Sequence, residues 1–327
     1  MNINLRRLCA AALCVLGAYG GQAGAADFPA KPVLLVIPFA PAGSTTLVFR
    51  VMAQKMSEGL GQQIVILSKP GGAATIGMNQ VAKATPDGYT VGAATLSFTA
   101  NPPFMGDKMP FNTEKDFVAV GMVSRLPMVL AINPNVAARS MKELIALAKS
   151  KPNVLNYGSA GIASSGHLGG ALFELEAGIK MTHIPYSTTS SMDGLVGGQH
   201  QVQVSPVPSL LQFIKAGRIL ALGVTTLQPD PSLPGVPTIA DSGLPGFEAY
   251  EWSGIVAPRG TPQAVIKRLE SEIVKTLKDP DVKQKIEAMG ARLAGGTQAE
   301  LADHIKRELP KWAKVFKELR ANGSIKD

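Results

Sequence analysis

The sequence predicts an α/β protein of two lobes with a cleft between them. Three observations carry this prediction: short apolar runs alternate with helical patterns, two extended runs stand near the middle, and a second alternating series follows them. Strand, loop and helix in that order form a βα unit, which predicts a parallel sheet covered by helices. With 327 residues, 46% of them hydrophobic, the chain is long enough for one large or two ordinary domains.

The first 26 residues have the pattern of an export signal. A basic region with two arginines precedes an apolar run over residues 8–18, and small residues surround a predicted cleavage site near Ala25 and Ala26. An apolar run of this length is too short for a bilayer core, which needs about 20 residues. We therefore expect a soluble protein that is exported to the periplasm.

Charge and cysteine content narrow the function classes. The 32 basic and 24 acidic side chains give a net charge of +8, a modest excess that by itself favours no partner. Cys9 and Cys14 are the only cysteines, and both lie in the export segment, so we expect a mature chain without disulfides or thiolate metal sites. Aromatic residues make up 6% of the chain and the basic residues are dispersed, which argues against a nucleic-acid partner.

The first alternating series begins with a β-branched apolar run at residues 33–39. It ends in Ala40-Pro41-Ala42-Gly43, which indicates a buried strand that enters a loop. A helix is predicted over residues 44–60, closed by Gly61. The series continues with strands at 64–67 and 89–94, a helix near 76–84 and a turn at 85–88.

Two extended runs, 118–123 and 128–132, are separated by Ser124-Arg125-Leu126-Pro127 and are suited to crossing between lobes. A second series starts with the capping box Ser140-x-x-Glu143, whose side chains satisfy the end amides of a helix. Its strands are predicted at 155–157, 182–184, 201–204 and 219–225, and its helices at 165–177, 190–196 and 209–215.

The C-terminal part begins with a stretch rich in proline and glycine at 227–246, which indicates a long ordered loop. After a strand at 252–257, Thr261 is expected to cap a helix that Pro262 begins, and Thr297-x-x-Glu300 to start another. We assign residues 27–124 and 225–327 to one lobe, lobe 1, and residues 125–224 to the other, lobe 2. The cleft is expected at the carboxyl ends of both sets of strands.

No catalytic or metal-binding motif stands out. The residues around Ser159 do not match the nucleophile-elbow motif of hydrolases, Gly-x-Ser-x-Gly, because Tyr157 occupies the position of its first glycine. The four histidines stand far apart without metal-ligand spacing, and the glycine-rich run 71–77 lacks the lysine of a phosphate loop. We expect a protein that is not an enzyme and holds no metal or cofactor. An exported hydrolase that uses Ser159 and one histidine is the weaker alternative.

Three loops rich in glycine, serine and threonine follow predicted strands, at 40–46, 95–99 and 159–165. Free amides at a helix start carry partial positive charge and hold a carboxylate without a formal cation. Helix capping alone explains any single hydroxyl in these loops. Three such loops that face one cleft favour the capture of an anionic ligand.

Short motifs lie along the whole mature chain. They are PFAPAGST from Pro38, KPGGAATIG from Lys69, PDGYT from Pro86, LNYGSAG from Leu155, HIPY from His183, GGQ from Gly197 and APRGTP from Ala257. Together they resemble the substrate-binding receptors of tripartite tricarboxylate transporters, often called Bug-type periplasmic receptors. The resemblance implies a type II periplasmic binding protein fold, in which two lobes close on a small carboxylate. It also implies a monomer whose partners are the membrane components of such a transporter.

The resemblance implies binding residues in five loops, at the positions that match the family. These residues are Phe39, Pro41, Ala42, Gly43, Ser44, Thr45, Thr46, Thr95, Ser97, Ser159, Ala160, Gly161, Ala163, Ser164, Ser165, His167, Tyr186, Ser205 and Pro206, with Ser187 and Thr188 beside them.

Departures from the family pattern concern charge. Thr46, Gln201 and Ser205 stand where relatives usually carry an acidic residue. Gln201 lies inside a predicted strand and is interpreted as structural, so only Thr46 and Ser205 bear on the ligand. Loss of a carboxylate near the cleft removes repulsion against an anion and removes a partner for an ammonium group. We therefore expect a plain mono- or dicarboxylate, with an aromatic acid as one option given Phe39 and Phe98. The alternative function is an exported carboxylate receptor that signals to a membrane sensor and delivers no cargo.

Overall fold

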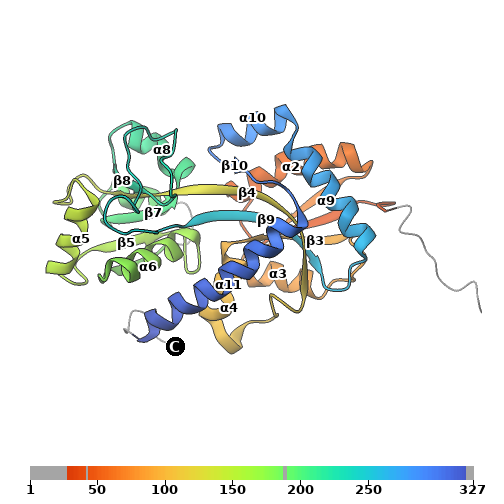
Figure 1. The fold of residues 1–327 in the computed structure, drawn as a ribbon, viewed down its shortest axis with the longest axis horizontal. Helices are drawn as coiled ribbons and strands as arrows, with labels where there is room; N and C mark the ends of the chain where they lie inside the picture. Colours follow the sequence, from red (N-terminus) through yellow and green to blue (C-terminus); the bar gives the residue numbers. More distant parts are fainter. Residues whose placement is uncertain (1–27, 42, 187–189, 322–327) are drawn as a thin grey trace, which may run out of the picture.

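The computed structural model of the protein describes residues 28–41, 43–186 and 190–321 (Figure 1). The predicted export segment with both cysteines, Ala42, Ser187 and Thr188 lie outside the described residues. In the described part of the chain, no helix is both long enough and apolar enough to cross a membrane.

Strands and helices alternate along most of the chain. The strands are β1 (Val33–Ile37), β2 (Ile64–Ser68), β3 (Thr90–Thr95), β4 (Phe117–Ile132), β5 (Asn156–Ser159), β6 (Thr182–Pro185), β7 (Val202–Pro206), β8 (Leu220–Val224), β9 (Tyr250–Pro258) and β10 (Arg292–Leu293). The α-helices are α2 (Ser44–Leu60), α3 (Thr75–Ala82), α4 (Leu96–Met105), α5 (Met141–Ser150), α6 (Ser165–Ala177), α7 (Ser190–Val196), α8 (Val207–Lys215), α9 (Gln263–Leu277), α10 (Pro280–Ala288) and α11 (Gln298–Ala321). Short 3₁₀ turns cover Gly72–Ala74 and Gly106–Lys108.

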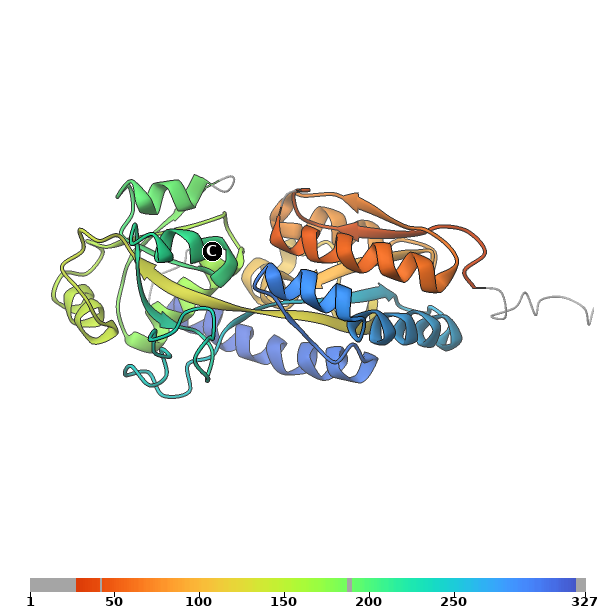
Figure 2. The same cartoon turned by 90° about the horizontal axis from the view of Figure 1, so that it is seen from above.

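One sheet runs through the molecule in the order β2-β1-β3-β9-β4-β7-β5-β6, and β8 and β10 also pair with β4. Strands β1, β2 and β3 are parallel and belong to lobe 1, and strands β5, β6 and β7 are parallel and belong to lobe 2. The long strands β4 and β9 run between these two groups (Figures 1 and 2). The predicted lobe boundaries near residues 124 and 224 stay a prediction.

The predicted parallel sheet is correct within each lobe and wrong for the strands between the lobes. Strands β3 and β9, β4 and β9, and β4 and β7 pair antiparallel. The reason is topological, because the chain crosses from one lobe to the other in β4 and returns in β9. The two extended runs predicted around residues 124–127 are one continuous strand, in which bulges between Ala119 and Gly121 and between Met122 and Ser124 shift the register.

Helix α2 follows from its local sequence. Its apolar stripe of Val48, Phe49, Met52 and Met56 is buried against α9 and the sheet. Full burial of one such side chain stabilises the fold by about 2 kcal/mol. Gly61 ends the helix in the left-handed region at φ 70°, which glycine adopts without steric cost, so the predicted end of this helix is confirmed.

The sequence pattern missed α4, because two prolines lie in its second half and residues 95–99 were predicted as a loop. Pro102 has no amide hydrogen to donate to the carbonyl of Phe98, four residues earlier. The hydroxyl of Thr113 donates to that carbonyl at 3.1 Å, and the guanidinium of Arg320 donates to two carbonyls near the C-terminal end of the helix. These long-range bonds replace part of what the prolines remove.

Two of the three predicted helix caps are confirmed. Ser140 accepts from the amide of Glu143 at 3.2 Å, and Thr297 accepts from the amide of the residue three positions later at 3.1 Å. The prediction for Thr261 is wrong: its hydroxyl donates to the carbonyl of Pro258 at 2.8 Å, and α9 begins without a side-chain cap. The turn after β9 offers that hydroxyl a carbonyl within reach, so it closes the turn.

Helix α11 lies beside the crossing strands and contacts elements of both lobes (Figures 1 and 2). Its Leu301, Trp312 and Phe316 are buried. The ring of Phe316 packs on Phe104 of α4, with 5.2 Å between ring centroids. The C-terminal helix therefore supports lobe 1 and the strands that lead to lobe 2.

Candidate functional site

The parallel strands of the two lobes point their carboxyl ends toward each other. Strand β3 ends at Thr95, opposite Ser253 of β9, and Ser253 pairs with Ser124 of β4. Strand β7 ends at Pro206, opposite Met128 of the same β4. The four steps along the strand from Ser124 to Met128 span about 13 Å. The ends of β3 and β7, where α4 and α8 begin directly, therefore approach one crossing segment from opposite sides.

Three helices, α2, α4 and α6, follow β1, β3 and β5, and their N-termini lie at strand ends that face the other lobe. None of the three helices carries an acidic residue in its first turn, and α2 and α4 have no side-chain cap. The first turns of α3, α8 and α9 also lack an acidic residue, whereas α5 starts with Glu143, α10 with Asp281 and α11 with Glu300. First-turn amides have no acceptor within their own helix, so the N-termini of α2, α4 and α6 offer donors and partial positive charge to an anion.

In lobe 1, the predicted hydroxyls bond mainly to their own loops. The Thr46 hydroxyl donates to the carbonyl of Ala40 at 2.9 Å, and the hydroxyls of Thr95 and Ser97 lie 3.0 Å apart. Thr95 and Ser97 are buried and line a cavity of about 10 Å³, which is about the volume that one water molecule requires. The structure brings these residues together as a prepared loop, with most of their polar groups already partnered.

The loop between β2 and α3 has an unusual backbone. Ala73 and Ala74 have φ angles of 53° and 75°, in the left-handed region that costs residues with a side chain about 1 kcal/mol or more each. The side-chain amide of Asn101 donates to the carbonyl of Ala73 and connects this loop to α4. Backbone strain of this kind is common where a loop is shaped for a ligand.

In lobe 2, the loop between β5 and α6 is closed around the carbonyl of Gly161. The hydroxyls of Ser159 and Ser164 donate to this carbonyl at 3.0 and 2.7 Å. Ser164 also accepts from the amide of His167 at 3.3 Å and so caps α6. Ala163 is left-handed at φ 61°, and its amide donates to Nδ1 of His167 at 3.0 Å. The predicted binding loop is a rigid turn in front of the helix.

Two histidines stack behind this loop. The ring centroids of His167 and His183 lie 4.2 Å apart, and Nε2 of His183 is 2.7 Å from the hydroxyl oxygen of Ser159. Burial lowers the pKa of His167 to about 4; burial, and to a lesser degree the neighbouring His167, lowers that of His183 to about 3. A base this weak is poorly matched to proton abstraction near neutral pH, and Ser159 is fully buried. The pair supports the loop.

The ends of β6 and β7 are connected through two side chains, His200 and Gln203, that were not among the predicted site residues. Tyr186 contacts His200, His200 contacts Gln203, and Gln203 contacts Ser205. The pairing depends on strand register, and its one sequence signal is the polar alternation of Gln201, Gln203 and Ser205 in an otherwise apolar strand.

A buried carboxyl at the crossing segment was also missed. Glu251 of β9 pairs with Leu126 of β4 and hydrogen-bonds the hydroxyl of Ser165, the first residue of α6. Burial raises the pKa of Glu251 to about 7, and the Ser165 hydroxyl lowers it by a smaller amount. The sequence signal for this buried carboxyl was a single acidic residue in the otherwise apolar run YEWSGIVAP.

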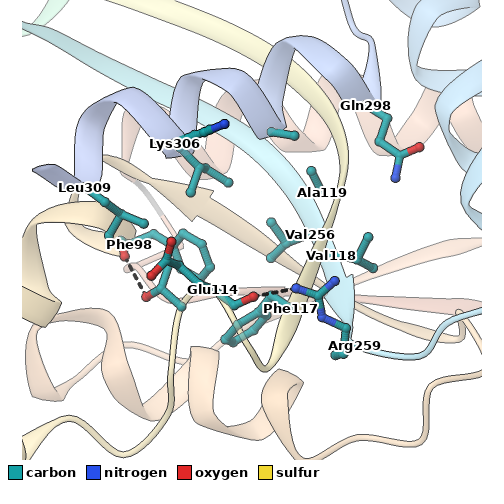
Figure 3. A pocket seen from close by; sticks show the side chains of 13 residues that line it. Phe98, Glu114, Phe117, Val118, Ala119, Val256, Arg259, Gln298, Lys306 and Leu309 are labelled. Carbon is teal, nitrogen blue, oxygen red and sulfur yellow. Dashed lines mark hydrogen bonds between the residues drawn. The ribbon is translucent and has the colours of Figure 1, made fainter.

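A further cavity, of about 320 Å³, lies beside α11 (Figure 3). Its lining includes Phe117, Val256 and Arg259, from the ends of β4 and β9 farthest from lobe 2. Phe98 also reaches this cavity, but it packs edge-on against Phe117 at 5.0 Å between ring centroids. Phe98 is therefore part of an aromatic cluster, and it also lines the small cavity beside Thr95 and Ser97. The option of an aromatic ligand stays a prediction.

The fold and the facing loops define a two-lobed solute-binding receptor. Residues 48–321 match the family described as the tripartite tricarboxylate transporter family receptor, and the chain belongs to this family. The predicted family and the predicted α/β fold of a periplasmic binding protein are confirmed. The prediction that the protein is not an enzyme is also confirmed, because the family is one of receptors.

Three relatives illustrate the match. The chain is 32% identical to protein BugT of Bordetella pertussis over 330 residues, which cover 98% of this chain and 99% of BugT. The structure of Rhodopseudomonas palustris Rpa4515 with adipate is 32% identical, has a TM-score of 0.80 and covers 89% of this chain and 97% of its own. MatC (Rpa3494) of Rhodopseudomonas palustris with bound malate is 28% identical, with a TM-score of 0.80 and coverages of 88% and 100%.

Proposed function

We propose that the protein is a periplasmic receptor that captures a small organic carboxylate, either a mono- or a dicarboxylate, and delivers it to the membrane components of a tripartite tricarboxylate transporter. Membership of the receptor family supports the class of function. The dicarboxylates in the two Rhodopseudomonas palustris structures support the class of ligand. The pattern of an export signal at the N-terminus supports the periplasmic location.

The observation that carries this proposal is the arrangement of α2, α4 and α6. Their N-termini lie at strand ends that face each other across the crossing strands, and none has an acidic residue in its first turn. A carboxylate placed there satisfies amides that otherwise require water, and it gains from the aligned helix dipoles. Binding therefore needs neither a metal ion nor a formal cation.

Capture is coupled to closure of the two lobes. A ligand stabilises the closed arrangement only by the difference between its free energy of binding in the closed and the open state. Residues from both lobes must therefore contact the ligand together, with Thr45 and Thr95 among those from lobe 1 and Ser164 and Ser205 among those from lobe 2. Strands β4 and β9, which connect the lobes, are the elements that bend.

Calorimetry with purified protein tests the proposal. We expect adipate, malate or benzoate to bind more tightly than the amine of matched length, namely 6-aminohexanoate, 4-amino-2-hydroxybutanoate and benzylamine respectively. Ser164→Ala should weaken binding of the acid by about 1 to 3 kcal/mol, because this hydroxyl holds the loop that presents the amides of α6. Tighter binding of an amine than of its matched acid contradicts the proposal. Failure of all three acids to bind also contradicts it.

The matched control for this variant is Ser140→Ala. Ser140 caps α5 with a bond of 3.2 Å to an amide three residues later, as Ser164 caps α6 with one of 3.3 Å. Both variants lose a cap, which costs about 1 kcal/mol of stability. Only Ser164→Ala should weaken carboxylate binding. Equal binding by both variants would leave Ser164 with a capping role alone.

Delivery to a transporter needs a test in cells. Deletion of the gene should abolish uptake of the radiolabelled acid, and re-expression of the full chain should restore it. A deletion strain that takes up the acid normally but no longer induces genes in its presence would favour the sensor alternative.

A further inference from the structure

Four polar side chains in lobe 2 form one hydrogen-bonded chain, which we call the lobe 2 relay. The hydroxyl of Tyr186 lies 3.1 Å from Nδ1 of His200, and Nε2 of His200 lies 3.0 Å from Oε1 of Gln203. The side-chain amide of Gln203 donates to Oγ of Ser205 at 2.9 Å. Tyr186 follows β6 and Ser205 lies near the end of β7, so the relay connects two strand ends that point toward lobe 1.

The middle of the relay is buried and its ends reach solvent. His200 is 0% and Gln203 1% exposed, whereas Ser205 is 8% exposed and Tyr186 is half-buried. The second hydrogen of the Gln203 amide points to the hydroxyl of Ser191, with 3.4 Å between the amide nitrogen and the hydroxyl oxygen. The nitrogen of this amide therefore faces two hydroxyl oxygens, and its oxygen faces the imidazole.

Two glycines make room for the rings of the relay. A Cβ atom at Gly158 would lie 2.3 Å from the imidazole of His200, and one at Gly194 would lie 2.5 Å from the hydroxyl of Tyr186. These close approaches hold both rings in place. Burial also lowers the pKa of His200 below its ordinary value of 6.5. The imidazole is therefore neutral at pH 7 and carries a single N–H.

A neutral imidazole gives the relay a direction, because one of its nitrogens donates and the other accepts. The amide oxygen of Gln203 only accepts, so Nε2 of His200 carries the hydrogen and Nδ1 is the acceptor. Tyr186 must then donate to Nδ1, and its contact with Oε1 of Gln199 is longer, at 3.4 Å. At the other end Ser205 accepts from Gln203 and keeps its own hydroxyl hydrogen.

We propose that the lobe 2 relay fixes the Ser205 hydroxyl as a hydrogen-bond donor toward the ligand, and so selects a carboxylate oxygen over an ammonium group at that point. Within the described part of the chain, no acceptor lies within hydrogen-bond distance of the Ser205 hydrogen. His200 and Gln203 are positioning residues that act through Ser205. The inference rests on the proposed function, because it requires a ligand at the end of β7.

Gln203→Glu tests the direction of the relay. A carboxylate at this position accepts from both His200 and Ser205, so the Ser205 hydrogen turns inward and its oxygen alone faces the ligand. We expect the ratio of acid to matched-amine affinity to fall about tenfold, measured by calorimetry with adipate and 6-aminohexanoate. If malate or benzoate binds more tightly than adipate, the same comparison uses malate with 4-amino-2-hydroxybutanoate, or benzoate with benzylamine.

Two controls separate hydrogen-bond direction from added charge. Gln201→Glu adds a charge in the segment that leads into β7 but outside the relay, where its oxygen accepts from the amide of Asn156, and it should leave the ratio unchanged. In a Ser205→Ala background, Gln203→Glu should change the ratio by less than about twofold. An equal change in both backgrounds would overturn the inference, because the charge would then act through space.

A measurement on the wild-type protein does not depend on the folding of any variant. With ¹⁵N-labelled histidine, NMR should show His200 as the Nε2–H tautomer, with its signal assigned by loss in His200→Phe. The Nδ1–H tautomer would overturn the inference. Wild-type protein that binds none of the three acids contradicts the proposed function and the inference with it. Wild-type protein that binds an acid while Gln203→Glu keeps the ratio contradicts the inference alone.

Discussion

The loops at the strand ends of lobe 1 and lobe 2 are held in different ways. In lobe 1, backbone conformation and local bonds shape the loops: Ala73 and Ala74 are left-handed, and the hydroxyls of Thr46 and Thr75 donate to carbonyls of their own loops. In lobe 2, buried side chains from separate elements meet, as in the stack of His167 on His183 and in the lobe 2 relay.

This difference indicates where ligand specificity resides. A loop held by its own backbone presents amides, and amides bind any carboxylate. A network of buried side chains fixes which atoms donate and which accept, since each unmet partner costs about 1 to 3 kcal/mol. We expect lobe 1 to contribute general affinity for anions and lobe 2 to distinguish between ligands.

The largest expected effect is that of Gly158→Ala in lobe 2. The new Cβ would lie 2.3 Å from the His200 ring, so the ring must move and the lobe 2 relay must break. Overpacking together with unpaired buried groups should lower the free energy of unfolding by about 4 kcal/mol, measured with urea. In lobe 1, Gly43→Ala brings a Cβ only to 3.3 Å from the carbonyl of Ala40 and should cost less than about 1 kcal/mol. Similar costs would remove the contrast between the lobes.

The second effect concerns Glu251 at the junction of the lobes. Its pKa of about 7 lies above its ordinary value of 4.5, so the folded protein keeps a proton that the unfolded chain loses in this interval. The stability it contributes is complete below pH 4.5 and is lost as the pH rises through 7, by up to about 3 kcal/mol.

Glu251→Gln should therefore be about as stable as wild type near pH 4.5 and more stable at pH 8, in urea unfolding at both pH values. The exposed Glu114→Gln serves as the control and should show no such pH-dependent difference. A stability difference that does not change with pH would mean that Glu251 is ionised in the folded protein.

A smaller effect is expected for Thr46→Val in lobe 1. The variant keeps the shape of a buried side chain and removes the hydrogen bond to Ala40. Ala40 is exposed, and its carbonyl still accepts from the amide of Gly43 at 3.0 Å, so the free energy of unfolding should fall by about 1 kcal/mol. A loss as large as that of Gly158→Ala would show that lobe 1 also depends on a side-chain network.

The smallest effect is expected to be stabilising. Ala73→Gly and Ala74→Gly each relieve a left-handed conformation and should raise the free energy of unfolding by up to about 1 kcal/mol. Ala53→Gly in the interior of α2 is the control and should lower it by about 1 kcal/mol. Thermal unfolding of the three variants shows directly whether each is more or less stable than wild type. A loss of stability at position 73 or 74 would mean that the loop relaxes on substitution.

Much of the fold could be predicted from local sequence patterns. The bounds of α6 and α7 agree with the prediction, and Gly61 ends α2 as expected. Local patterns failed where a distant residue replaced a local bond. Helix α4 tolerates its prolines because Thr113 and Arg320 supply hydrogen bonds from elsewhere in the chain.

The sequence by itself determined the alternation of strands and helices, the family of the chain and the loops where a ligand is expected. The alternation follows from propensity, capping and apolar period, which act over a few neighbouring residues, and the family follows from the resemblance of short motifs along the chain. Only the tertiary structure decided the antiparallel crossing strands, the contact of Ser165 with Glu251 and the direction of the lobe 2 relay. Each of these depends on strand register and burial, which bring together residues far apart in the chain.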